Sequence, residues 1–220
     1  MAPNPDPDPD TEAGMDGHAI VQSRVVVFDA PPQEVWPWLA QMGHGRAGWY
    51  SLDIVERMIG AARSVDGWRS LGRVEPSLAT VSEGDHIPMG RGLDLEVVVA
   101  REPEQLALVL DRDVVGGHLR FEWTFALQPV ARREGIDVDA VTADRPSPAG
   151  TASSLPDAAR EHPDEDDREG GGEVGTLLRV RTVMHARPPS LRMAVMGLLG
   201  PGHRIMEAAQ LRGLRRRVDD

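Results

Sequence analysis

A glycine-rich stretch at residues 43–48, GHGRAG, has the spacing of a nucleotide-binding motif, G-x-G-x-x-G. In dinucleotide-binding proteins that motif lies between a strand and a helix, so that backbone amides meet a pyrophosphate. Here a predicted helix that contains tryptophans precedes the glycines. The stretch therefore favours a connector that shapes the mouth of a cavity over a nucleotide site.

The seven histidines show no metal-ligand spacing, because no H-x-x-x-H or H-x-x-E-H pair occurs. His118 and His185 fall at solvent-facing positions of predicted strands. His44, His86 and His203 lie in or beside predicted loops, where each is a candidate to face a ligand. We predict no metal site and no cofactor.

The aromatic pair Trp49-Tyr50 directly follows the glycines and contains the only tyrosine. Such a pair fits two interpretations: a core anchor, or the wall of a pocket for a molecule that is mostly hydrocarbon with one or two oxygens. The nine methionines fit both as well, since thioether side chains fill ordinary cores and pockets for apolar ligands.

Two residue types are missing. The chain has no cysteine, and its 24 basic residues are all arginine. These absences exclude thiol nucleophiles, disulfides, Schiff-base chemistry and the P-loop lysine. No G-x-S-x-G elbow occurs, and nothing distinguishes a glycosidase pair among the carboxylates. The net charge of −11 argues against nucleic acid as a partner.

The excess acidic charge lies in two stretches with few large apolar side chains. Residues 1–20 hold five acidic residues and no arginine, and residues 131–172 hold eleven against five arginines, so they contribute −5 and −6 to the net charge of −11. Neither can offset the entropy of ordering. We predict a disordered tail at 1–19, a disordered insert at 131–174 and a single domain over 20–217. Neither a signal peptide nor a membrane span is evident, which predicts a cytoplasmic protein with no integral membrane association.

Hydrophobic spacing predicts the elements that position these residues. A β-branched run at 20–28 predicts a strand, and a helix follows from Pro32. A second helix is expected from about Ser51. Alternation over 93–99, 106–110, 119–127 and 178–186 predicts strands of an antiparallel sheet, the last two forming a hairpin whose loop is the insert.

The C-terminal part has helical spacing, interrupted by Gly200-Pro201-Gly202. It predicts a short helix followed by a longer one from near Pro201. The apolar face of strand 119–127 needs a cover, and the terminal helix is expected to supply it.

Several strings resemble the SRPBCC superfamily, the START-like group of polyketide cyclases, dehydrases and lipid-transport proteins. VVVFDAPPQEVWPWLAQMG resembles its strand-then-helix start; GRAGWYSLD, GDHIPMG, FEWTFALQP, LLRVRT and GPGHRIMEAAQLRGLRRR resemble later blocks of bacterial members. The long acidic insert departs from the family pattern. The resemblance implies an α+β helix-grip fold, in which a curved antiparallel sheet wraps around a long C-terminal α-helix and leaves a tunnel.

Three functions follow as hypotheses. The first is binding of a hydrophobic small molecule or lipid in a cavity between sheet and C-terminal helix. Its expected wall residues are Trp38, Trp49, Tyr50, Met58, Trp123, Met184 and Met206. The second is an enzyme of the polyketide aromatase/cyclase type, in which polar groups transfer protons. Its candidates are Tyr50, Asp53, His86, Arg120 and His203, of which Arg120 has a strand parity that directs it away from the apolar face.

The third hypothesis is a protein-interaction module that uses the acidic insert and the arginines at 212–217. The sequence predicts no oligomeric state.

Overall fold

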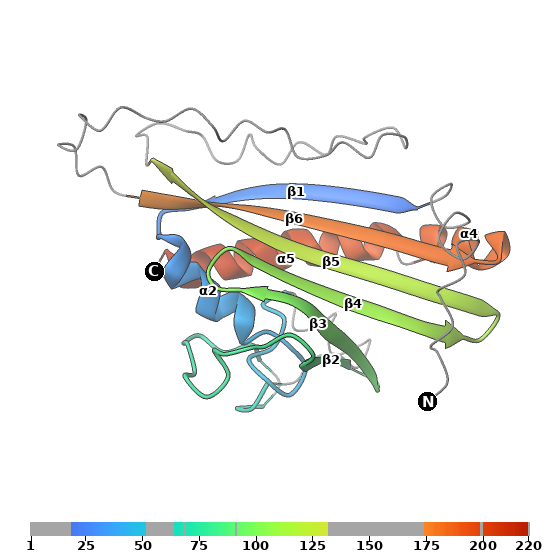
Figure 1. The fold of residues 1–220 in the computed structure, drawn as a ribbon, viewed down its shortest axis with the longest axis horizontal. Helices are drawn as coiled ribbons and strands as arrows, with labels where there is room; N and C mark the ends of the chain where they lie inside the picture. The colour runs from blue at the N-terminus through green and yellow to red at the C-terminus, as the bar shows by residue number, and fades with distance from the viewer. Residues whose placement is uncertain are drawn as a thin grey trace, which may run out of the picture.

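The computed structural model describes residues 19–51, 64–67, 69–90, 92–131, 174–198 and 200–219. Within them, six strands form one antiparallel sheet in the order β1-β6-β5-β4-β3-β2 (Figure 1). The strands are β1 (Ile20–Phe28), β2 (His86–Gly90), β3 (Leu93–Arg101), β4 (Gln105–Val114), β5 (Gly117–Ala131) and β6 (Val174–Arg187). The described helices are α2 (Pro32–Ala40), α4 (Pro189–Leu198) and α5 (Gly200–Val218).

The elements predicted at the N-terminal end of the domain are confirmed. β1 covers the β-branched run, and α2 begins at Pro32 after Pro31 in an extended conformation. Proline suits the first helical turn because its missing N–H would have no partner there. The helix predicted from about Ser51, the tail and nearly all of the insert lie outside the described residues.

The four strands predicted from alternation are also confirmed. β3 and β4 pair around the turn at 102–104, and β5 pairs with β6 in one continuous register from His118↔Arg187 to Ala131↔Val174. The short strand β2, which pairs with β3, was not predicted. It has only five residues and contains Pro88, and proline within a short run obscures the signal of an edge strand.

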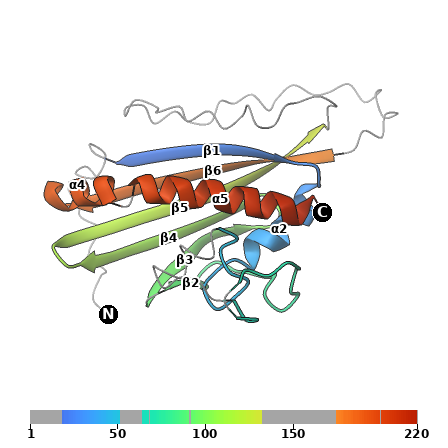
Figure 2. The ribbon, with the colours of Figure 1, turned by 180° about the vertical axis from the view of Figure 1, so that it is seen from behind.

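The expectation of a helix-grip fold is wrong. The C-terminal helical segment is divided into α4 with 10 residues and α5 with 19, as the Gly-Pro-Gly interruption predicts. α5 lies along one face of the six-stranded sheet, and no long helix wrapped by the sheet is present among the described residues (Figure 2).

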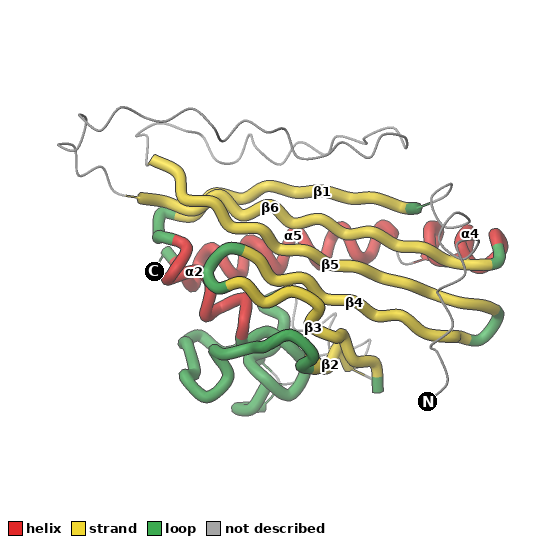
Figure 3. Tube along the Cα trace, in the orientation of Figure 1, coloured by secondary structure: helices red, strands yellow, loops and turns green. Residues whose placement is uncertain are grey.

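The helices lie on one face of the sheet (Figure 3), and the buried core includes side chains from both layers. Alternation along β5 buries Phe121, Trp123, Phe125 and Leu127, as predicted. Buried positions on α5 have helical spacing, and two of them are polar: the set is Glu207, Gln210, Leu211 and Leu214, of which Glu207 and Gln210 are the polar pair. A polar pair on the buried face of a helix is unusual for a core that only packs.

At Gly213, α5 lies directly against the loop that follows α2. A Cβ there would collide with the backbone carbonyl oxygen of Tyr50, whose own φ is 58°, a conformation unfavourable for any residue but glycine. We expect Gly213→Ala to lower the free energy of unfolding by about 1–3 kcal/mol, measured by urea denaturation.

Gly202→Ala is the control, because it lies in the same helix and its Cβ would meet nothing within 4 Å. Alanine favours helix over glycine, so this control should be neutral or stabilising. Equal effects of the two substitutions would contradict the close approach.

Candidate functional site

An aromatic cluster on the inner face of the sheet is centred on Trp123 of β5. Trp49 stacks on it with ring centroids 5.7 Å apart and an interplanar angle of 26°. Phe125 and Phe121 lie 4.9 and 6.0 Å from the Trp123 ring. Both indoles are only 6% exposed. The structure thus brings together two of the expected wall residues from segments that are far apart in the sequence.

The glycine-rich stretch is the connector that brings Trp49 to the sheet. Gly43 and Gly48 form a bridge to each other, with φ angles of 132° and 84° that only glycine adopts readily. The Arg46 guanidinium donates hydrogen bonds to the carbonyl oxygens of Met42, Ala40 and Leu78 at 3.1, 3.0 and 2.9 Å, and its burial lowers its pKa. The stretch follows α2 and folds on itself, so it lacks the strand-to-helix setting of a nucleotide site.

The indole N–H of Trp49 is buried and has no hydrogen-bond acceptor among the described residues. The indole N–H of Trp36, in α2, is also buried without an acceptor among the described residues. A buried donor without an acceptor costs about 1–3 kcal/mol, and folded proteins leave few of them. The arrangement at Trp49 therefore offers an aromatic surface with an available hydrogen-bond donor at its edge.

A row of polar side chains continues from the aromatic cluster across β6 and β1. Trp123 pairs with Thr182, and Thr182 pairs with Gln22, so the three side chains share the inner face. The Thr182 hydroxyl donates to Oε1 of Glu207 at 3.3 Å. Oε1 of Gln22 is buried and has no donor among the described residues.

Arg24 of β1, next to this row, connects the sheet to α5. Its Nε lies 2.8 Å from Oε2 of Glu207, and the two side chains are only 17% and 2% exposed. Its Nη2 donates to the carbonyl oxygen of Arg204 at 3.1 Å. The carboxylate and the guanidinium thus neutralise each other inside the molecule.

Tyr50 serves as an anchor between the loop, α2 and α5. Its hydroxyl oxygen accepts from Nε2 of Gln41 at 2.7 Å, its ring meets Trp38 edge-on at 5.9 Å, and the Arg217 guanidinium lies 5.1 Å above it. Burial raises the pKa of Tyr50, so the phenol stays protonated. These contacts agree with the anchor interpretation of the Trp49-Tyr50 pair, whereas Trp49 itself lies on the sheet.

The remaining expected wall residues divide between the inner face and segments that are not described. Met184 of β6 is buried, and Met206 of α5 is half-buried. Met58 lies outside the described residues, as does the enzyme candidate Asp53.

The enzyme candidates that the structure describes do not form one site. His86 is exposed on the edge strand β2, and the side chain of His203 is outside the description. Arg120 lies on the outer face, where it pairs with Asp111 and Glu122 at 2.7 Å each, as its parity predicts. Tyr50 is buried near α2.

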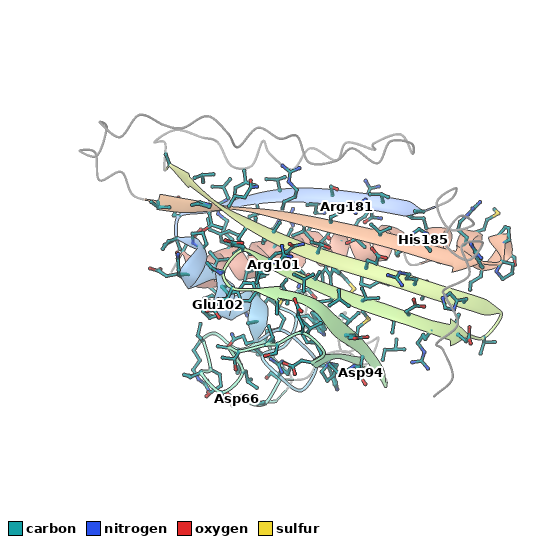
Figure 4. The ribbon with its side chains drawn as sticks, viewed as in Figure 1. Asp66, Asp94, Arg101, Glu102, Arg181 and His185 are labelled. Atoms are coloured by element: carbon teal, nitrogen blue, oxygen red, sulfur yellow. The ribbon has the colours of Figure 1, made fainter. Side chains whose placement is uncertain are left out.

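The outer face of the sheet is charged. His118 pairs there with Asp111 and Asp113 at 2.7 and 3.1 Å, and Arg181 and His185 project from β6 away from α5 (Figure 4). The solvent-facing positions predicted for the two histidines are thereby confirmed. In the described ranges, no group of three or more His, Asp or Glu side chains is placed to hold a metal ion.

Sequence reasoning missed the polar residues of the inner face, Gln22, Glu207 and Gln210. The signal was present: Gln22 has the parity of Val26 and Phe28 in β1, and positions 207, 210, 211 and 214 have the spacing of one helix face. Glutamate and glutamine at such positions are interpreted as surface residues unless it is already known which face of the strand or helix is buried.

None of the described helices has an apolar stretch of the length that crossing a bilayer takes. No protein-family model matches the chain, and no curated protein matches it. Among solved structures, it is similar to the X-ray crystal structure of protein MLL2253 from Mesorhizobium loti, with 17% identity and a TM-score of 0.40 over 92% of this chain and 97% of that one. That likeness is too distant to support a conclusion about fold or function.

Proposed function

We propose that the protein binds a small, mainly apolar molecule on the inner face of the sheet, between the Trp49–Trp123 stack and α5. The observation that supports this most is the buried indole N–H of Trp49, which has no acceptor among the described residues. An apolar molecule with an oxygen at its edge would cover the aromatic rings and accept this hydrogen bond.

The buried polar residues of α5 support the same proposal. Both Glu207, which contacts Arg24 and Thr182 of the sheet, and Gln210, whose Nε2 donates to Sδ of Met42 at 3.1 Å, are buried, where a core built for packing alone would have apolar side chains. The enzyme hypothesis lacks comparable support, because Tyr50 is buried whereas His86 is exposed and Arg120 pairs with acidic residues on the outer face. Membership of the SRPBCC superfamily and a cytoplasmic location stay predictions.

A pair of probes tests whether the Trp49 indole recognises an oxygen. We expect the protein to bind 4-acetylbiphenyl about fivefold more tightly than 4-ethylbiphenyl, since a neutral hydrogen bond is worth about 1 kcal/mol. Trp49→Phe keeps an aromatic ring and removes the N–H, so it should abolish this preference. Dissociation constants from isothermal titration calorimetry give both values.

Trp38→Phe is the matched control, because the Trp38 ring packs on Tyr50. It should keep the preference for the acetyl probe. Failure of both probes to bind would contradict the proposed function, and a preference that survives Trp49→Phe would remove Trp49 from the site.

A further inference from the structure

We propose that the ligand is a neutral molecule with two polar ends, whose second end presents a hydroxyl hydrogen to Oε1 of Gln22. This inference rests on the proposed function, because it concerns the same ligand. It assigns to the row of residues beside the aromatic cluster a role in selecting which apolar molecule binds.

The register fixes the distance between the two ends of the site. Gln22, Thr182 and Trp123 lie opposite one another on three neighbouring strands, and neighbouring strands are about 4.8 Å apart. The Cα atoms of Gln22 and Trp123 are therefore separated by about 10 Å, two strand spacings. A molecule that covers the Trp49–Trp123 stack and reaches Gln22 needs a body of about two fused or linked rings.

The chemistry of the second end follows from which groups around Gln22 already have partners. Arg24 donates to Glu207 and to the carbonyl oxygen of Arg204, and Glu207 also accepts from Thr182. Oε1 of Gln22 is buried and lacks a donor among the described residues. A carbonyl oxygen can only accept, so the complementary ligand group is a donor.

Charge decides between the possible donors. The Arg24–Glu207 pair is internally neutralised, so a buried ammonium group would have no free counter-ion in it and would bear a large desolvation cost. A carboxylate would face the oxygens of Gln22 and Glu207 and could donate nothing. A neutral donor group meets both conditions, and we take a hydroxyl as the simplest such group.

Matched biphenyl probes test this inference on the intact chain. The probes are 4-acetyl-4′-hydroxybiphenyl and 4-acetyl-4′-methoxybiphenyl, in which a methyl group replaces the hydroxyl hydrogen. We expect the hydroxyl probe to bind about fivefold more tightly. Gln22→Met keeps the side-chain length and removes the acceptor, so it should equalise the two dissociation constants.

Ser23→Ala is the matched control, because Ser23 is the next residue of β1 and is exposed on the opposite face. It should keep the hydroxyl preference. If both probes bind equally to the unmodified protein, or if the preference survives Gln22→Met, the inference is overturned and the proposed function stands. If neither probe binds, nor 4-acetylbiphenyl, the proposed function fails and the inference fails with it.

Discussion

Replacing Arg24 by methionine is expected to lower the free energy of unfolding by about 3–5 kcal/mol, because the substitution leaves a buried carboxylate without its partner. Glu207 is 2% exposed, and its Oε2 lies 2.8 Å from Nε of Arg24. Water cannot replace the guanidinium at that depth. Chemical denaturation in urea at neutral pH, with an unchanged dependence on urea concentration, measures the loss.

The double variant Arg24→Met/Glu207→Met separates the net contribution of the ion pair to the free energy of unfolding from the cost of removing only one partner. Replacement of a whole buried ion pair by apolar side chains is often neutral or stabilising, so the double variant should recover most of the loss. Arg73→Met is the control, because the Arg73–Asp66 pair is exposed to solvent, and its denaturation midpoint should not move. If the Arg24→Met variant is as stable as this control, the buried carboxylate of Glu207 does not require Arg24 to stabilise it.

Gln41→Leu is expected to have the second large effect, a loss of about 2–4 kcal/mol, because it removes three hydrogen bonds from a fully buried amide. Nε2 of Gln41 donates to the Tyr50 hydroxyl and to the carbonyl oxygen of Arg73 at 2.7 and 3.1 Å. Its Oε1 accepts from the backbone N–H of Glu75 at 2.8 Å. One side chain thus joins the end of α2 to two later segments of the chain.

The same substitution on the exposed side of α2, Gln33→Leu, is the matched control. It changes the same atoms without removing these bonds, so it should leave the urea midpoint nearly unchanged. Tyr50→Phe should lie between the two, since it removes one of the three bonds. A Gln41→Leu protein as stable as Gln33→Leu would mean that the loop is held by other contacts.

The strands could be predicted because period-two alternation directly reports which face of a sheet is buried. Leu119 to Leu127 and Leu178 to Ala186 gave both the hairpin and its inner face. The helix-grip fold was wrong because it came from resemblance of local strings, which do not determine how a sheet and a helix curve around each other. The short strand β2 was missed because Pro88 and Gly90 hide its pattern.

The candidate site could be predicted only in its aromatic half. Trp49 and Trp123 were expected wall residues because large rings in a loop and on an apolar strand face share the same interior. Tyr50 follows Trp49 directly, but its side chain contacts Gln41 and Arg217, and its φ is positive. The partnership of Arg24 with Glu207 spans 183 residues, and no local pattern reports a contact at that separation.

The pairing of β5 with β6 should depend little on the length of the segment that connects the two strands. Fourteen residue pairs set its register, from His118↔Arg187 to Ala131↔Val174, and the entropy of closing a loop grows only logarithmically with loop length. This end of the molecule is therefore the natural place to graft a foreign sequence, such as an epitope or a reporter domain. The opposite end of the two strands offers no such freedom, because Gly117 packs directly against the carbonyl group of Arg187.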